Sequence, residues 1–227
     1  INIWDTISIV GNKIFNIPLR AGIKPEDVAI IWEIRLPRVL LAFGVGASLA
    51  VSGAIIQSIL KNPLASPYTL GVSSGASLGV GIYIVLGISI PVVGNLAMPI
   101  IGFLCGVLTV FAVIIFSNKV DRGLSNNTVI LAGMVLSLFT SAMLTTITAL
   151  CSEDIKAITM WQMGSFAMKS WSYVFAGIPF FIIGIFMAVR YTREMDILSF
   201  GEDGAKAIGV ETKKVKKTLL VSVAILT

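Results

Sequence analysis

Two long stretches of this chain carry no charged side chain. Asp, Glu, Lys and Arg are absent from residues 62–118 and again from residues 123–152. Apolar runs of about 18 or more residues without charges are typical of helices that cross a membrane. Only 13% of the residues are charged, whereas soluble globular domains carry about 25%. The sequence therefore predicts an all-α fold, namely a polytopic transmembrane helical bundle.

Five complete membrane spans and the beginning of a sixth follow from the apolar runs. The spans cover residues 39–60, 71–90, 98–117, 128–150 and 172–189, and the sixth begins near residue 218. The chain starts with Ile1 rather than Met and stops inside an apolar run. We therefore interpret residues 1–227 as one partial transmembrane domain that is truncated at both ends.

Basic residues in the loops predict the orientation of the spans. Five crossings put residues 61–70, 118–127 and 190–217 on one side, with ten Lys and Arg, and residues 1–38, 91–97 and 151–171 on the other, with seven. Because cytoplasmic loops are enriched in Lys and Arg, the first set is predicted to be cytoplasmic. Its basic residues are Lys61, Lys119, Arg122, Arg190, Arg193, Lys206, Lys213, Lys214, Lys216 and Lys217. The net charge of +5 then reflects membrane topology and not nucleic-acid binding.

The chain lacks the groups that several classes of transporter and enzyme need. Its five predicted spans contain no Asp, Glu, Lys, Arg or His, whereas ion-coupled carriers usually bury such groups. It has no His, two distant cysteines (Cys105 and Cys151), and no G-x-x-x-x-G-K-[ST] phosphate loop. We therefore predict no metal site, no cofactor in this chain and no enzyme activity, so that ATP hydrolysis for any pumping would come from another subunit.

Arg35 and Arg38 flank Leu36-Pro37 just before the first predicted span, and two interpretations are open. Arginines at the end of a span can extend toward lipid headgroups. Alternatively, because a guanidinium pairs bidentately with a carboxylate, the two residues can receive acidic side chains of an extracytoplasmic partner. The predicted topology puts both arginines on the outer face, as the second interpretation requires.

Two sets of residues inside the spans are candidates for packing or for a pathway. Gly71, Gly75 and Gly79 lie on one helical stripe, which lets helix backbones approach closely in a membrane. The polar and methionine residues of the 128–150 span either face a channel or pack in the core, and core packing is favoured. These residues are Met134, Thr140, Ser141 and Met143.

A longer motif connects these features. Residues 35–79 read RLPRVLLAFGVGASLAVSGAIIQSILKNPLASPYTLGVSSGASLG. Its arginine pair, Gly- and Ala-rich helix, NPLA-P turn and G-V-S-S-G-A segment occur in the order found in FecCD/BtuC-type permeases. The chain resembles this family, whose members are the membrane subunits of ABC importers for iron–siderophores, haem and cobalamin. The likeness runs from about residue 30 to the end, and it implies that further spans precede Ile1 and follow Thr227.

The resemblance implies roles for particular residues. Arg35 and Arg38 would receive acidic residues of a substrate-binding protein. A gate at the cytoplasmic end of the pathway would consist of Asn62, Pro63 and Leu64, with Ser125 and Asn126 as a counterpart in the next cytoplasmic loop. Segment 198–210 resembles the family's coupling segment, L-x-x-G-x-x-x-A-x-x-x-G, and the residues concerned are Leu198, Gly201, Glu202, Ala205 and Gly209. The alternative for this segment is a surface helix on anionic lipid.

The resemblance also implies a function and a set of partners. The chain would be a permease subunit in the bacterial plasma membrane that imports a metal chelate, with iron–siderophore favoured over haem or cobalamin. Its partners would be a cytosolic ABC ATPase that binds ATP and Mg, an extracytoplasmic substrate-binding protein, and a second permease subunit in a homo- or heterodimer. An ATP-independent secondary transporter or channel is the alternative, and it would work without segment 198–210.

Overall fold

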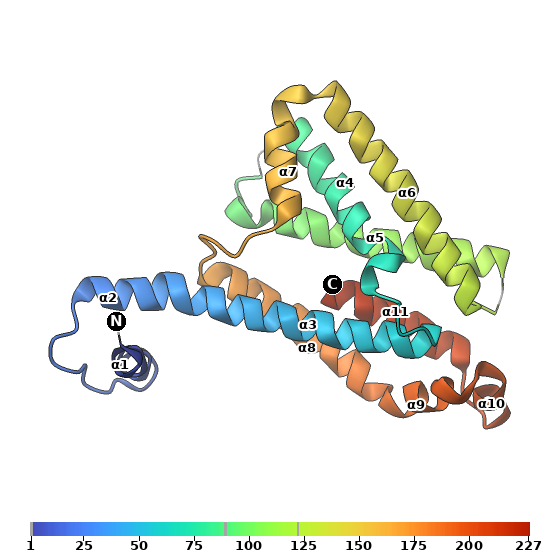
Figure 1. Ribbon diagram of the computed structural model, residues 1–227, viewed down its shortest axis with the longest axis horizontal. Helices are drawn as coiled ribbons and strands as arrows, with labels where there is room; N and C mark the ends of the chain where they lie inside the picture. Colours follow the sequence, from blue (N-terminus) through green and yellow to red (C-terminus); the bar gives the residue numbers. More distant parts are fainter. Residues whose placement is uncertain (1, 89, 122) are drawn as a thin grey trace. The chain divides into compact units, whose positions relative to one another are not determined.

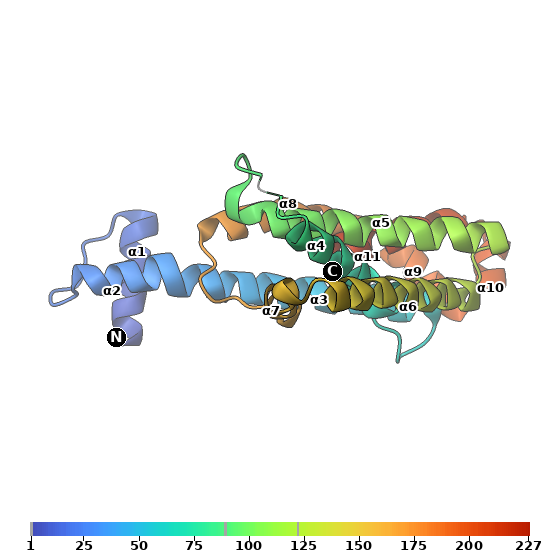
Figure 2. The same ribbon diagram turned by 90° about the horizontal axis from the view of Figure 1, so that it is seen from above.

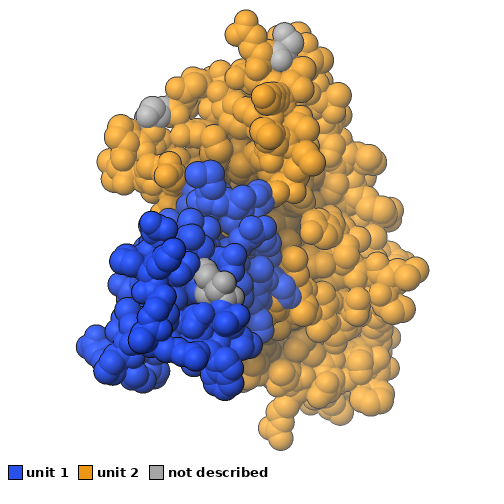
Figure 3. All heavy atoms as spheres, turned by 60° about the vertical axis from the view of Figure 1, so that its left-hand side comes forward, with its two compact units in different colours: residues 1–46, 165–179 blue, residues 47–164, 180–227 orange. Residues whose placement is uncertain are grey.

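All regular secondary structure is helical in the residues that the computed structural model describes, which are 2–88, 90–121 and 123–227. The predicted all-α class is therefore confirmed. Ser89, near the end of the predicted 71–90 span, and Arg122, one of the predicted cytoplasmic basic residues, lie outside the described residues. The chain divides into two compact units (Figure 3). Unit 1 comprises Ile1–Gly46 and Ser165–Pro179, and unit 2 comprises Ala47–Gly164 and Phe180–Thr227.

Unit 1 is helical over most of the region that the sequence predicted as a loop before the first span. It contains α1 (Ile3–Phe15), α2 (Pro25–Ala29), the π-helix η1 (Ile30–Arg35), and parts of α3 (Leu36–Leu60) and α8 (Trp171–Arg190). The Asn2 N–H donates to Asp5 Oδ2 at 3.1 Å, which caps the start of α1. α1 packs against η1, and Ile9 and Ile31 are buried.

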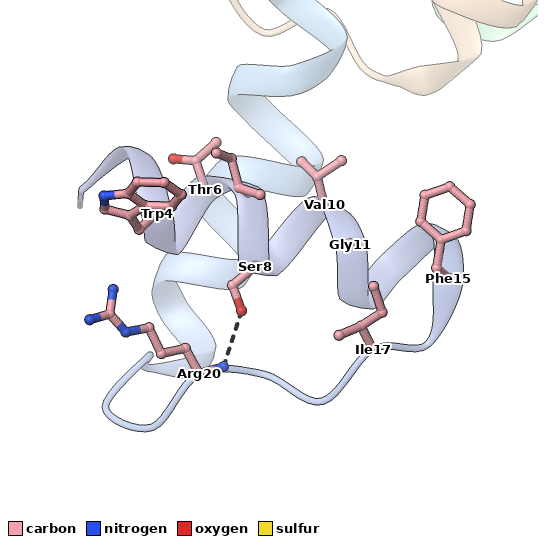
Figure 4. A pocket seen from close by; sticks show the side chains of 9 residues that line it. Trp4, Thr6, Ser8, Val10, Gly11, Phe15, Ile17 and Arg20 are labelled. Carbon is pink, nitrogen blue, oxygen red and sulfur yellow. Dashed lines mark hydrogen bonds between the residues drawn. The ribbon is translucent and has the colours of Figure 1, made fainter.

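An open, mostly apolar groove runs between α1 and the segment that follows it (Figure 4). Trp4, Phe15 and Ile17 contribute its apolar walls. The segment is fixed to α1 because the Arg20 N–H donates to Ser8 Oγ at 3.0 Å, and the Arg20 guanidinium lies 3.8 Å from the Asp5 carboxylate. α1 is thus a tethered amphipathic helix rather than a loose terminal segment.

Unit 2 contains the remaining parts of α3 and α8 together with a helical bundle (Figure 1, Figure 2). Its other elements are η2 (Pro67–Leu70), α4 (Val72–Val85), η3 (Gly94–Leu96), α5 (Ala97–Val120), α6 (Asn126–Leu150), η4 (Ser152–Asp154), α7 (Ile155–Met163), α9 (Thr192–Phe200), α10 (Glu202–Ala207) and α11 (Thr212–Leu226).

Four helical stretches among the described residues are long and apolar enough to cross a membrane. They are Pro25–Leu60, Gly94–Val120, Asn126–Leu150 and Trp171–Arg190. The predicted 71–90 span corresponds to α4, which has only 14 residues, whereas a span needs about 20. α4 is shorter than predicted because the helix ends at Val85, with Leu86 as its C-cap, and Gly87 then has a φ of +59°.

Glycine allows α4, α5 and α6 to pack closely. A Cβ at Gly75 would collide with Thr109 of α5, and a Cβ at Gly79 would collide with Cys105 of the same helix. Gly71 has a φ of +77°, so it makes the left-handed turn from η2 into α4 that other residues rarely adopt. Gly75 and Gly79 thus lie at the α4–α5 contact, whereas Gly71, just before α4, lies closest to Ser137 of α6.

The core of unit 2 lies where α11 packs against α5. Leu219, Leu220 and Val223 of α11 are buried together with Val110 and Val113 of α5. The Ser222 hydroxyl, also buried, donates to the Gly184 carbonyl of α8 at 2.8 Å. α11 therefore has an apolar face toward the core. This face extends into the first turns of α11, before residue 218, where the sixth span was predicted to begin.

Candidate functional site

Arg35 and Arg38 lie at the junction of η1 and α3 in unit 1. They are three positions apart on consecutive helical turns, so their side chains share one face. Both are exposed, and neither forms an ion pair with any residue that the structure describes. The two guanidinium groups are therefore free to meet carboxylates of another molecule.

Pro37 and Trp171 shape the helix beneath these arginines. The Leu36 N–H donates to Ile31 O in the π-helical register. In the same register, the backbone N–H of residue 37 would donate to Trp32 O. Pro37 has no N–H. Instead the Trp171 indole N–H donates to Trp32 O at 2.9 Å, so the start of α8 supplies the bond that the proline cannot.

The predicted gate turn is a short, closed loop after α3. Lys61 has a φ of +51°, and Asn62 Oδ1 accepts a hydrogen bond from the Leu64 N–H at 2.9 Å. Pro63 and Leu64 are exposed, whereas Ala65 behind them is buried. Among the described residues, no hydrogen bond or ion pair joins this turn to Ser125 or Asn126.

The second predicted gate element is a turn between α5 and α6. Asp121 Oδ1 accepts from the Gly123 N–H at 2.8 Å, and its Oδ2 accepts from the Ser125 N–H at 3.0 Å. The Ser125 side chain and these two N–H groups hold the pKa of the Asp121 carboxyl below its ordinary value of 3.8. Leu124 has a φ of +54° and is fully buried. The turn is thus held by its own carboxylate.

The predicted coupling segment is two helices, because Gly201 breaks α9 from α10 with a φ of +140°. Leu198 and Ala205 are buried in unit 2, so they hold the segment against its own bundle and are not available for a partner. The exposed apolar residues are Phe200 and Ile208, at 91% and 67%. Neither residue was predicted from the sequence, although each adjoins a glycine at the end of a helix.

Lys216 is a further residue that was not predicted from the sequence. It was counted among the basic residues of a predicted cytoplasmic loop, yet it is 1% exposed. Its ammonium donates to Leu124 O at 3.1 Å, to Asn126 Oδ1 at 2.7 Å and to Glu202 Oε1. Lys216 precedes the predicted span that begins near 218, and burial lowers the pKa of its ammonium below 10.5 while Glu202 opposes that shift. Position 216 falls on the apolar face of α11, which was the available signal.

A pocket of about 660 Å³ opens between α4, α6 and α7 in unit 2. Its lining is rich in hydroxyl groups and contains no charged residue among those described: Tyr68, Ser73, Ser74, Ser77, Ser137, Ser141, Leu144, Thr145, Thr148, Ala149, Ile155, Ile158, Thr159 and Gln162. Thr140 is not among them, because its hydroxyl donates to Ser74 Oγ at 2.9 Å and packs α6 against α4. Met134 and Met143 are partly exposed elsewhere on α6.

The chain matches the model of the FecCD transport family over residues 1–227. It is 41% identical over 203 residues to the uncharacterized ABC transporter permease protein YvrB of Bacillus subtilis, covering 89% of this chain and 58% of that protein. It is 31% identical to the cobalamin import system permease protein BtuC of Halobacterium salinarum, covering 99% and 58%, and 35% identical to the hemin transport system permease protein HmuU of Yersinia pestis, covering 86% and 59%.

A solved structure agrees with these sequence relatives. It shows a metal-chelate type ABC transporter in an inward-facing conformation, with a TM-score of 0.77 and 28% identity, and the match covers 96% of this chain and 69% of that one. This chain spans a little under three fifths of the length of the curated relatives named above. The several apolar helices and the whole-length match identify a multi-pass membrane protein that belongs to the FecCD transport family.

Proposed function

We propose that this chain is a permease subunit of a binding-protein-dependent ABC importer that moves a metal chelate into the cytoplasm across a bacterial plasma membrane. The match to the FecCD transport family over the whole chain carries the proposal. The family consists of transport subunits and not of enzymes, so the hydrolysis of ATP, with its Mg, belongs to a partner.

The partner ATPase would dock on α9 and α10. Phe200 and Ile208 are large apolar side chains exposed at either end of α10, and exposed apolar patches of this kind favour a protein contact. Leu198 and Ala205 would fix α9 and α10 to the bundle from within, and Gly201 and Gly209, with φ of +140° and +87°, would set the angles at the two ends of α10.

An extracytoplasmic binding protein would dock on Arg35 and Arg38. Their exposure and their lack of an ion pair among the described residues support this role, because a preformed internal pair would compete with carboxylates of the partner. The exposed Lys24 of the same unit has a different position and offers a matched control.

The hydroxyl-lined pocket would form part of the transport pathway, completed by a second permease subunit in a homo- or heterodimer. Its volume of about 660 Å³ falls within the range of small-molecule sites, about 300–1,000 Å³. An uncharged lining suits a ligand that is already chelated, since a bare ion would need polar groups to replace its hydration. The turns at Asn62–Leu64 and at Ser125–Asn126 would close the cytoplasmic end.

The cargo is proposed as an iron–siderophore, with haem and cobalamin as alternatives. Relatives carry the names of permeases for cobalamin, hemin and iron uptake, and another is named as a molybdate permease. Cobalamin and hemin each hold a metal inside an organic ligand, which is the chemistry expected of a ferric siderophore. Molybdate is therefore included as a small-anion control in the test.

The test is uptake into proteoliposomes that contain the full-length transporter, its ATPase and its binding protein. Labelled ferric siderophore, haem, cobalamin and molybdate are followed with and without ATP. We expect ATP-dependent entry of one chelate, loss of entry in Arg35→Glu and Arg38→Glu, and unchanged entry in Lys24→Glu. Entry that is indifferent to ATP would overturn the proposal and support a secondary transporter or channel.

A further inference from the structure

The ammonium group of Lys216 joins two segments that lie far apart in the sequence. Lysine offers three N–H donors, and all three are used: one by Glu202 of α10, one by the Leu124 carbonyl in the α5–α6 turn, and one by the Asn126 side chain at the start of α6. Figure 1 and Figure 2 place α10 and the start of α11 at the end of the bundle where α5 gives way to α6.

Burial makes the hydrogen bonds of Lys216 hard to replace. Lys216 is 1% exposed, so water cannot substitute for a lost partner without opening the bundle. The neighbouring Lys214 differs, because it and its partner Glu211 are both exposed, at 71% and 77%, with 4.0 Å between their charged atoms. Lys216 thus connects segments inside the bundle, whereas Lys214 on the same helix forms an ion pair that is exposed to solvent.

Each end of the connection belongs to a segment that has further contacts of its own. At one end, Glu202 is the first residue of α10, next to Gly201, and Ala205 one turn later is buried. At the other end, Asp121 closes the turn that contains Leu124, and Asn126 is the first residue of α6. α6 then carries Ser137, Ser141 and Thr145 into the pocket. A helix transmits a displacement at its first residue to those positions.

We propose that Lys216 is a positioning residue that couples the ATPase-docking helix α10 to the start of α6, so that movement of α10 changes the pathway lined by α6. This inference rests on the proposed function. It assigns the coupling to a buried three-way contact within one subunit, and it predicts that neither the α5–α6 turn nor α10 moves independently while Lys216 is in place.

The first test measures ATP hydrolysed per cargo molecule imported in the complete transporter. We expect Lys216→Met to raise this ratio at least fivefold, and Lys214→Met to leave it unchanged. The double variant Lys216→Met with Glu202→Gln removes both charges of the pair, so it should regain the stability lost in Lys216→Met but keep the raised ratio. If the double variant regained both its stability and the wild-type ratio of ATP to cargo, the proposal would be overturned, because a merely structural role predicts that result.

A second test does not depend on transport. Nitroxide labels at the exposed positions Asp203→Cys and Asn127→Cys, with Cys105 and Cys151 changed to Ser, report the distance from α10 to the start of α6 by pulsed electron paramagnetic resonance. We expect one narrow distance in the nucleotide-free and the vanadate-trapped complex, and a broad distribution in the double variant. A distribution that is equally narrow without Lys216 and Glu202 would overturn the coupling, even if the cargo and the importer assignment hold.

Discussion

The Trp171 indole N–H donates to the Trp32 carbonyl at 2.9 Å, and the two rings lie 5.0 Å apart between centroids. This contact links the start of α8 to the π-helix that ends at Arg35. It satisfies a carbonyl that Pro37, without an N–H, leaves unpaired in the π-helical register. The helix beneath the arginine pair therefore depends on a residue more than a hundred positions away.

Trp171→Phe should destabilise the protein by about 1 kcal/mol, because a smaller aromatic ring replaces the indole and one hydrogen bond to a half-buried group is lost. Thermal unfolding in detergent, followed by fluorescence, measures the effect. The control is Trp4→Phe, since Trp4 is exposed on α1 and should change the unfolding temperature little. Equal unfolding temperatures for the two variants would contradict a role for the indole bond.

Gly133→Ala should destabilise the bundle by about 1–3 kcal/mol. A Cβ at this position would collide with the Thr69 carbonyl of η2, and because both groups belong to the backbone, no side-chain rotation relieves the contact. Gly53→Ala is the control, since a Cβ there meets nothing within 4 Å. Alanine in place of glycine within a helix should stabilise that variant by about 0.5–1 kcal/mol. Denaturation in detergent separates the two outcomes.

Much of the fold could be predicted because the length of an apolar run is enough to identify a membrane helix. The uncharged runs anticipated α5 and α6 within a few residues at each end. α1 was missed because a polar, amphipathic helix has no such run; the pair Asn2 and Asp5, at N-cap spacing, was the local signal that could have found it. The division into two units could not be read from the sequence, since it depends on contacts between distant segments.

The candidate site could be predicted only in part, for a similar reason. The spacing of the motif located α10. It did not indicate which residues are buried, namely Leu198 and Ala205, and which are exposed, namely Phe200 and Ile208. Lys216 was counted in a cytoplasmic loop because lysines cluster around it. The position of Lys216 on the apolar face of α11 was a local signal of burial, whereas its partners follow only from where Glu202 and the α5–α6 turn lie in three dimensions.

Ser141→Trp should reduce cargo uptake at least tenfold while the complex still assembles, because the new ring would fill part of the hydroxyl-lined pocket. The measurement is ATP-driven uptake in proteoliposomes at equal amounts of assembled transporter. Met143→Trp is the matched control, since Met143 lies two residues further along α6 and does not line the pocket. Similar losses in both variants would show that the pocket is not part of the pathway.

The Asp121 carboxylate should make the α5–α6 turn sensitive to acid. Its pKa is lowered in the folded state by the Ser125 side chain and by the N–H groups of Gly123 and Ser125. A lowered folded-state pKa means that the carboxylate stabilises the turn above 3.8, its ordinary value, and that this contribution is lost as the pH falls through the folded-state pKa. The Lys216 ammonium, on the adjoining α11, acts in the same direction.

The mobility of a nitroxide at Asn127→Cys reports the state of this turn as the pH is lowered. We expect a transition with its midpoint below 3.8 in the otherwise wild-type protein. Asp121→Asn should lack that transition and show a mobile turn already at neutral pH, because an amide can accept at one oxygen only. Glu202→Gln should retain the transition, which separates Asp121 from the nearby acid of α10. A transition that survives in Asp121→Asn would assign the acid sensitivity to another group.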